Sequence, residues 1–149
     1  MIKKFILSFL IVACFTVLLY TFILTPVNVS GASMLPTYHN NQKVWLYRLS
    51  QVKKGDVVIV RKDGETFIKR VVAGPGDELN ILSDGTVIVN GEKLEETYVD
   101  ELSREPLSIS LPYTIPEDCY FVMGDNRIVS FDSRSFGAVP REDILGVVF

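Results

Sequence analysis

The feature that most constrains this chain is an uncharged apolar run at residues 5–24, FILSFLIVACFTVLLYTFIL. A helix needs about 20 such residues to cross the hydrocarbon core of a bilayer. Lys3 and Lys4 precede the run and no basic cluster follows it closely, so the positive-inside rule predicts a cytoplasmic N-terminus. Pro26 is expected to end the helix. The predicted organisation is a cytoplasmic segment at residues 1–4, a transmembrane anchor at 5–24 and an extracytoplasmic domain at 25–149.

A cleavable signal peptide is the alternative interpretation of the same run. Ser30-Gly31-Ala32 has the small-x-small pattern that precedes a cut. The apolar region of a signal peptide is usually only about 7–15 residues long, however. This run is longer, which favours a retained anchor.

Charge and composition exclude several function classes. The 149 residues carry 15 Lys and Arg against 18 Asp and Glu, so the chain has no basic surface suited to nucleic acid. Its single histidine, His39, and its two cysteines, Cys14 and Cys119, show no metal-ligand spacing. We therefore expect no metal, and no disulfide because Cys14 lies in the apolar run. Cys119 lies in an apolar stretch and is expected in the core rather than as a nucleophile.

Beyond residue 25, short β-rich runs alternate with turn residues, and no long amphipathic helix is evident. Gly74-Pro75-Gly76-Asp77 and Asn90-Gly91 are strong turn signals. This pattern predicts a mainly β domain, an antiparallel β-barrel or sandwich. The expected strands lie at residues 43–49, 56–61, 66–73, 86–89, 119–123 and 144–149.

One predicted strand places a cation among apolar residues. Successive side chains point to opposite faces of a strand, so Phe67, Lys69 and Val71 share one face and Ile68, Arg70 and Val72 the other. Burial lowers the pKa of a lysine, and a neutral amine is a general base near pH 7, whereas arginine stays protonated. Alternatively, the Lys69 side chain reaches water or pairs with a carboxylate.

Two further segments could carry chemistry. Gly31 and Pro36 bracket a stiff turn that can expose the Ser33 hydroxyl and backbone N–H groups for acyl transfer, although a simple juxtamembrane turn fits as well. A dense polar loop at residues 124–134 follows an apolar strand, and its interleaved Asp and Arg residues suggest ion pairs that brace it. His39 lies close to Ser33 in sequence but is interpreted as part of a polar turn.

Taken together, these segments resemble the bacterial type I signal peptidases, the leader peptidases, in their compact single-anchor form. The resemblance covers nearly the whole chain, and four boxes behind one anchor in this order make it specific. The boxes are SGASMLPT at residues 30–37, GDVVIV at 55–60, FIKRVVAGPGD at 67–77 and GDNRIVSFDSRSFG at 124–137.

The resemblance implies roles for individual residues. Ser33 matches the nucleophile and Lys69 its general base, while Ser130 matches the hydroxyl that orients the lysine amine. Asp132 and Arg134 match a supporting ion pair. The remaining implied positions are Asp125 and Arg127 beside that pair, the Ser33 backbone N–H as oxyanion donor with Gly31 left open as a second, and Val29, Met34, Phe67 and Ile68 in small substrate pockets.

The chain departs from the family pattern at several positions. Gly31 stands where one large branch has a serine whose hydroxyl helps the oxyanion, and Phe67 stands where tyrosine is frequent. Ile128 and Val129 replace the usual polar pair in the last box. The change at Ile128 and Val129 touches none of the proposed catalytic groups.

The resemblance implies a serine endopeptidase of the bacterial cytoplasmic membrane, with a Ser/Lys dyad and no cofactor. Its expected partners are the lipid bilayer and exported preproteins cut after small-x-small sites, and no nucleic acid. Three alternatives remain open: a self-cleaving repressor-type protein, a non-enzymatic β-domain that binds exported chains, and a processing enzyme dedicated to one precursor. Trp45 is expected in the core, with a place in the lipid headgroup layer beside Tyr38 as the alternative.

Overall fold

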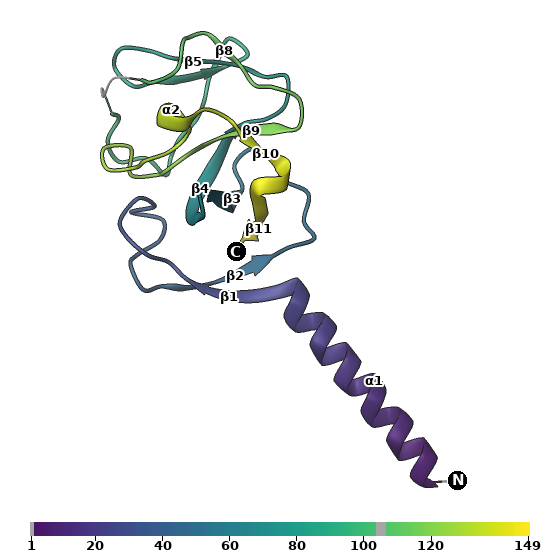
Figure 1. Cartoon of the computed structure of the whole chain (residues 1–149). Helices are drawn as coiled ribbons and strands as arrows, with labels where there is room; N and C mark the ends of the chain where they lie inside the picture. The colour runs from purple at the N-terminus through teal and green to yellow at the C-terminus, as the bar shows by residue number, and fades with distance from the viewer. Residues whose placement is uncertain (1, 104–106) are drawn as a thin grey trace.

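The computed structural model describes residues 2–103 and 107–149, so residue 1 of the predicted cytoplasmic segment lies outside it. Helix α1 (Ile2–Ile23) projects away from the rest of the chain (Figure 1). Residues Lys4–Ile23 are long and apolar enough to cross a membrane, and none of this span is buried. The helix ends one residue before the predicted boundary because Leu24 begins an edge strand, in which Pro26 lies opposite Trp45.

The remainder of the described chain forms two antiparallel sheets. The larger sheet has the order β1-β2-β11-β3-β4-β9-β10 and the smaller one β7-β6-β5-β8. The mainly β, antiparallel prediction is confirmed, although the strand order is open and no barrel closes among the described strands. The elements are β1 (Leu24–Asn28), β2 (Lys43–Tyr47), β3 (Val57–Lys62), β4 (Glu65–Ala73), β5 (Glu78–Ile81), β6 (Val87–Val89), β7 (Glu92–Lys93), β8 (Tyr113–Thr114), β9 (Cys119–Met123), α2 (Ser133–Phe136), β10 (Val139–Pro140), the 3₁₀ turn η1 (Arg141–Asp143) and β11 (Ile144–Val148).

Strand β3 holds the large sheet together because both of its faces are buried. Val58 and Val60 pack in one apolar cluster with Val71 of β4, whereas Val57 and Ile59 pack in a second cluster that extends to β1 and β2. A third cluster joins the ends of β4 and β9 to the small sheet, and the half-buried Cys119 packs against it. The turn after Ala73 therefore links two sheets through a shared core.

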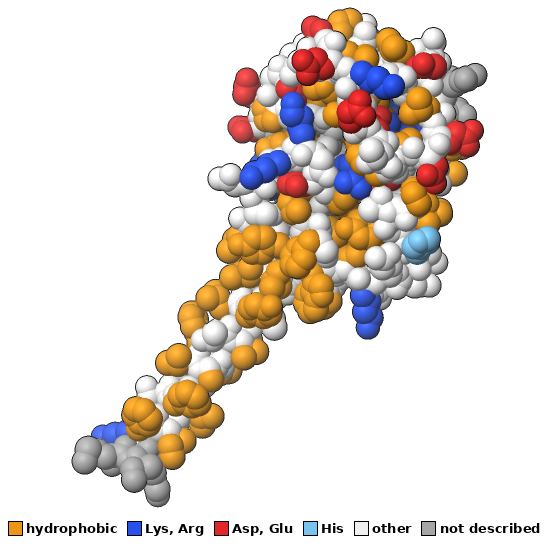
Figure 2. All heavy atoms as spheres, turned by 180° about the vertical axis from the view of Figure 1, so that it is seen from behind, with side chains coloured by type: hydrophobic (Ala, Val, Ile, Leu, Met, Phe, Trp, Pro, Cys, Tyr) orange, Lys and Arg blue, Asp and Glu red, His pale blue; other side chains and the backbone are white. Residues whose placement is uncertain are grey.

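Strand β2 turns an aromatic face outward. Val44 and Leu46 are buried, whereas the alternate residues Trp45 and Tyr47 are 47% and 38% exposed. The expectation that Trp45 packs in the core is wrong, because β2 presents only its other face to the sheet interior. From behind, hydrophobic side chains run along α1 and continue onto the adjoining end of the β domain (Figure 2).

Candidate active site

The structure brings Ser33 and Lys69 into direct contact. Ser33 lies in a turn that begins after β1 and contains a hydrogen bond from the N–H of Tyr38 to the carbonyl of Met34. Lys69 lies in β4, and its Nζ donates to the Ser33 Oγ over 2.9 Å. The partner of the Ser33 hydroxyl is therefore this amine, and His39 is an exposed turn residue.

The Lys69 amine is enclosed by apolar groups. The residue is only 2% exposed, and it shares its face of β4 with Phe67 and Val71. Its Nζ lies 5.6 Å from the centroid of the Phe67 ring. Phe131 meets the Phe67 ring edge-on at 6.2 Å and the Phe136 ring at 5.3 Å, which extends the aromatic surface outward. None of the salt bridges among the described residues involves Lys69.

This enclosure lowers the pKa of Lys69 from 10.5 to about 8. Burial is the main cause, because an ammonium loses hydration there. The charge of Asp132 opposes the shift and that of Arg134 adds to it. An amine with a pKa near 8 is partly neutral at physiological pH and can accept a proton from the hydroxyl beside it.

The turn around Ser33 leaves backbone donors unengaged. Among the described residues, the N–H of Ser33 donates to no acceptor, whereas the N–H of Gly31 donates to Oδ1 of Asn40 over 3.0 Å. The carbonyl of Ser33 accepts from the N–H of Asn126 over 3.0 Å. The loop after β9 thus anchors the carbonyl of Ser33, while the N–H of Ser33 remains available to a ligand.

Gly124 permits the close approach of the loop after β9 to the Ser33 turn. A Cβ on Gly124 would overlap the Ser130 Oγ and lie 2.5 Å from the carbonyl oxygen of Ser33. The Ser130 Oγ is buried and has no hydrogen-bond partner among the described groups, so no hydrogen bond joins it to Lys69. The structure places Ser130 beside the Ser33 turn, on the loop that follows β9.

The ion pair predicted between Asp132 and Arg134 is present. Asp132 is fully buried and accepts from the Arg134 Nε and Nη2 at 2.9 Å each. It also accepts from the N–H of Gly124 over 2.9 Å and caps the short helix α2 through the N–H of Arg134. One carboxylate therefore fastens both ends of the loop at residues 124–134.

Asp125 and Arg127, which the resemblance places beside that pair, do not pair with each other. Asp125 accepts two hydrogen bonds from Arg70, at 2.7 and 2.8 Å, and one from the Thr37 hydroxyl at 2.5 Å. Arg127 instead pairs with Glu96 and donates from Nε to the carbonyl of Gly124. Neighbours along the loop point apart, so each meets a charge from a different segment.

A small cavity of about 130 Å³ adjoins the dyad. Ser33 and Lys69 lie in its wall, together with Val29, Phe67 and Ile68, three of the four residues predicted to line substrate pockets. The fourth, Met34, is 1% exposed and packs in the core with Val29 and Val44 rather than in this wall. No group of three or more potential ligands suited to a metal ion occurs among residues 2–103 and 107–149.

A family model described as "Signal peptidase, peptidase S26" matches residues 2–149 of the chain. The chain belongs to this family. It is therefore an enzyme of the signal peptidase I family, which removes signal peptides.

Individual relatives agree with this assignment. Signal peptidase I T of Bacillus subtilis (strain 168) is 33% identical over 93% of this chain and 79% of its own length. Signal peptidase IB of Staphylococcus aureus (strain COL) is 33% identical over 98% of this chain and 88% of its own. The crystal structure of a signal peptidase I from Enterococcus faecalis V583 covers 67% of this chain and 98% of its own, with 29% identity and a TM-score of 0.57.

In this signal peptidase, sequence reasoning missed three residues that surround the predicted ones. Arg70 holds Asp125, Glu96 holds Arg127, and the Tyr98 ring lies 4.0 Å from the Arg70 guanidinium. Tyr98 also donates to Glu96, and burial is the largest cause that raises its pKa. The only signal in the sequence was the presence of acidic and aromatic residues in a polar stretch, which does not name their partners.

Proposed function

We propose that this chain is a membrane-bound serine endopeptidase that removes N-terminal signal peptides from exported preproteins after small-x-small sites. In this proposal Ser33 is the nucleophile and Lys69 the general base. The observation that carries it is the 2.9 Å contact between the Ser33 hydroxyl and a buried amine that forms no salt bridge with any described residue.

The reaction begins when neutral Lys69 takes the Ser33 proton and the Ser33 Oγ attacks the scissile carbonyl carbon. The unengaged N–H of Ser33 stabilises the oxyanion, and Gly31 adds no donor unless its bond to Asn40 breaks. Lys69 then gives the proton to the leaving amine, and water hydrolyses the acyl-enzyme. Ser130 and the Asp132–Arg134 pair position the dyad, and the reaction needs no cofactor.

The free edge of β4 gives the substrate a place to bind. Residues 65–69 pair with β3 on one side, whereas β9 pairs only with Arg70, Val71 and Ala73 on the other. An extended peptide can add to the open edge as a strand. The adjoining cavity is small and lined by Val29, Phe67 and Ile68, which favours small residues before the cut.

The anchor places this site close to the bilayer in the proposed topology. Helix α1 ends at Ile23, ten residues before Ser33, with residues 1–4 in the cytoplasm and the β domain outside. The exposed rings of Trp45 and Tyr47 lie on β2, which pairs with the strand that follows α1. Amphipathic aromatics favour the headgroup layer, so we place this face of β2 there.

Cleavage of a separate preprotein tests the proposal. The full-length protein in detergent, its Ser33→Ala and Lys69→Met variants, and a preprotein with an Ala-x-Ala site are incubated together and the products sequenced. We expect cleavage after the site by the unaltered enzyme and a loss of at least about 10³-fold in both variants. Equal cleavage by either variant would contradict the assigned dyad, and cleavage of its own chain alone would favour a self-processing protein.

A further inference from the structure

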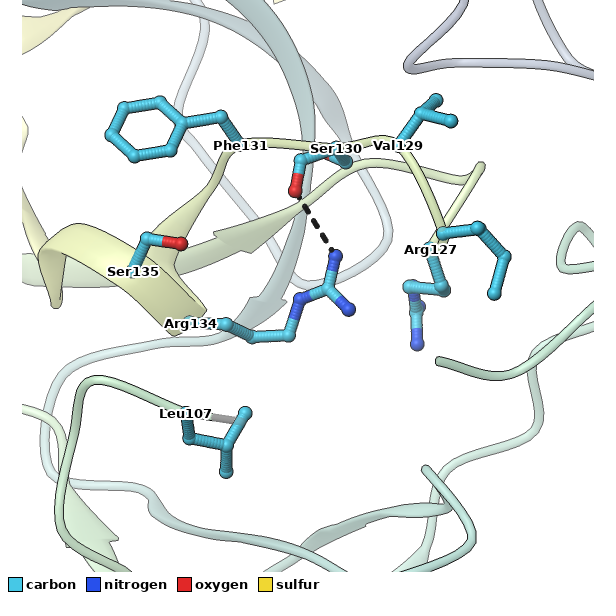
Figure 3. Close-up of a pocket in the computed structure, with 8 residues that line it drawn as sticks. Leu107, Arg127, Val129, Ser130, Phe131, Arg134 and Ser135 are labelled. Carbon is cyan, nitrogen blue, oxygen red and sulfur yellow. Dashed lines mark hydrogen bonds between the residues drawn. The ribbon is translucent and has the colours of Figure 1, made fainter. Parts of the chain in front are cut away.

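A second cavity, of about 320 Å³, opens on the loop between β9 and α2. Its wall includes Arg127, Ile128, Val129, Ser130, Phe131 and Arg134, and it shares no residue with the cavity that contains Ser33 and Lys69. In Figure 3 the side chains of Ser130 and Phe131 lie on one side and the guanidinium of Arg134 extends into the space between them and Leu107.

The two cavities adjoin at the dyad. Phe67 of the first cavity and Phe131 of the second are in edge-on ring contact. Asn126, which begins the loop, donates its N–H to the Ser33 carbonyl, and Ser130 lies against the Gly124 backbone beside that same carbonyl. A peptide that crosses Ser33 from the first cavity therefore has the second one beside its path.

The rim of the second cavity is unusually apolar for an exposed loop. Ile128 is 46% exposed, Val129 59% and Phe131 55%. None of the three residues belongs to a core cluster of the described chain. Exposed apolar residues next to a cavity are typical of a binding surface.

The floor of the cavity offers hydrogen-bond donors without a net negative charge. Arg127 is paired with Glu96 and Arg134 with Asp132. Arg134 also donates from Nη2 to the backbone carbonyl of Ser130 over 3.4 Å, the dashed line of Figure 3. Its Nη1 has no partner among the described groups and can donate to a peptide carbonyl. No acidic side chain is among the described residues that line the cavity, so this lining does not compensate the charge of a bound lysine.

We propose that this cavity binds the first residues of the mature chain, on the C-terminal side of the scissile bond, and that Ile128, Val129 and Phe131 select apolar over basic side chains there. The inference rests on the proposed function, since it assigns the first cavity to the substrate residues before the cut. Alternate side chains of an extended peptide point to opposite faces. We therefore expect the preference for apolar over basic side chains at one of the first three mature positions.

The test compares preproteins that differ only after the cut. Leu, Ser or Lys is placed at each of the first three mature positions, and kcat/KM is measured for the full-length enzyme and for an Ile128→Asn/Val129→Ser double variant. We expect the enzyme to prefer Leu to Lys by about tenfold at one position, the scale of a hydrophobic pocket's discrimination. The double variant is expected to reduce that ratio to below about twofold.

Two controls separate specificity from damage. Leu82→Ser removes an equally exposed apolar side chain from the small-sheet region and is expected to keep the tenfold ratio. A signal peptide that ends in a methyl ester has no mature residues and only a small leaving group, and the double variant should hydrolyse it within about twofold of the unaltered enzyme.

A flat Leu-to-Lys ratio in the unaltered enzyme, or a ratio that the double variant leaves unchanged, would overturn this inference while the peptidase assignment stands. A parallel loss of methyl ester hydrolysis would also overturn it, since it would show that the two side chains only support the dyad. Absence of any cleavage by the unaltered enzyme would instead overturn the proposed function.

Discussion

On the sheet side of the dyad, Lys69 is enclosed by valine and aromatic side chains, whereas on the loop side three guanidiniums each meet a carboxylate. The three pairs are Arg70–Asp125, Arg127–Glu96 and Arg134–Asp132. Among the described residues no carboxylate forms a salt bridge with the lysine, and burial lowers its pKa to about 8.

The contrast shows why two adjacent cations of β4 have different roles. Lys69 and Arg70 point to opposite faces, so one amine meets Ser33 and the apolar sheet while the next guanidinium meets Asp125. An amine can lose its proton when desolvated, but a guanidinium cannot and must be paired. Desolvation therefore prepares the base, and paired charges position the loop around it.

The largest effect is expected from Lys69→Arg. It keeps the positive charge but removes the group that can become neutral, so kcat/KM for a preprotein should fall at least about 10³-fold at every pH. Activity assays from pH 6 to 10 check this, with Lys62→Arg on the same hairpin as a control that retains activity. Activity in Lys69→Arg that rises with pH would contradict the assigned base.

The Asp132→Asn variant tests the loop side of the comparison. Arg134 would then be left without its anion, and breaking a buried pair costs about 3–5 kcal/mol. We expect the unfolding midpoint in urea to drop accordingly and cleavage to fall with it, because Asp132 also holds the N–H of Gly124. Asp63→Asn, at an exposed turn, is the control, and an equal response of both variants would contradict the bracing role.

Lys69→Met should raise stability while it abolishes activity. Between pH 8 and 10.5 the unfolded chain binds more protons at Lys69 than the folded one, so wild-type stability rises with pH across this window. Below pH 8 the variant should be the more stable by about 3 kcal/mol, and its advantage should disappear by pH 10.5. Urea unfolding at pH 7 and 10.5 checks this, and a variant that is less stable at pH 7 would argue against costly burial of the amine.

The smallest effect is expected from Thr37→Val, which removes one hydroxyl from the Arg70–Asp125 pair. The Thr37 hydroxyl donates to Asp125, but the two guanidinium bonds remain. We expect a loss of about 1 kcal/mol and activity within about threefold. Thr37→Ser keeps the donor and should restore the stability, and failure to do so would assign the effect to packing.

The sequence predicted those parts of the molecule that follow from local pattern. The apolar run predicted α1, and the β-rich run at residues 66–73 before a strong turn signal predicted β4. The apolar residues on both faces of that strand indicated that at least one of Lys69 and Arg70 is buried, but not which one. Strands β1 and β5 were missed because Pro26 argues against a strand and residues 78–81 are short and mixed. The exposure of Trp45 could have been predicted from the alternation along β2. Trp45 and Tyr47 share a strand face with Lys43, and a lysine favours the solvent-exposed face.

The charge partners could not be predicted in the same way. Arg70 and Asp125 are separated by 55 residues, and Arg127 and Glu96 by 31, so only the folded chain brings them together. The family resemblance implied the Asp132–Arg134 pair, and these two residues lie close together in the sequence on one short turn. The pairs between distant segments depend instead on how the strands and loops come together in the folded chain.

The most direct test of the account is the titration of the Lys69 amine itself. NMR of the full-length protein in detergent, with lysine labelled at Cε and the Lys69→Met spectrum used to assign the resonance, gives its pKa. The account predicts a single transition near 8 for Lys69. A transition near 10.5 for Lys69 would contradict the claim that burial against the sheet makes this amine the base.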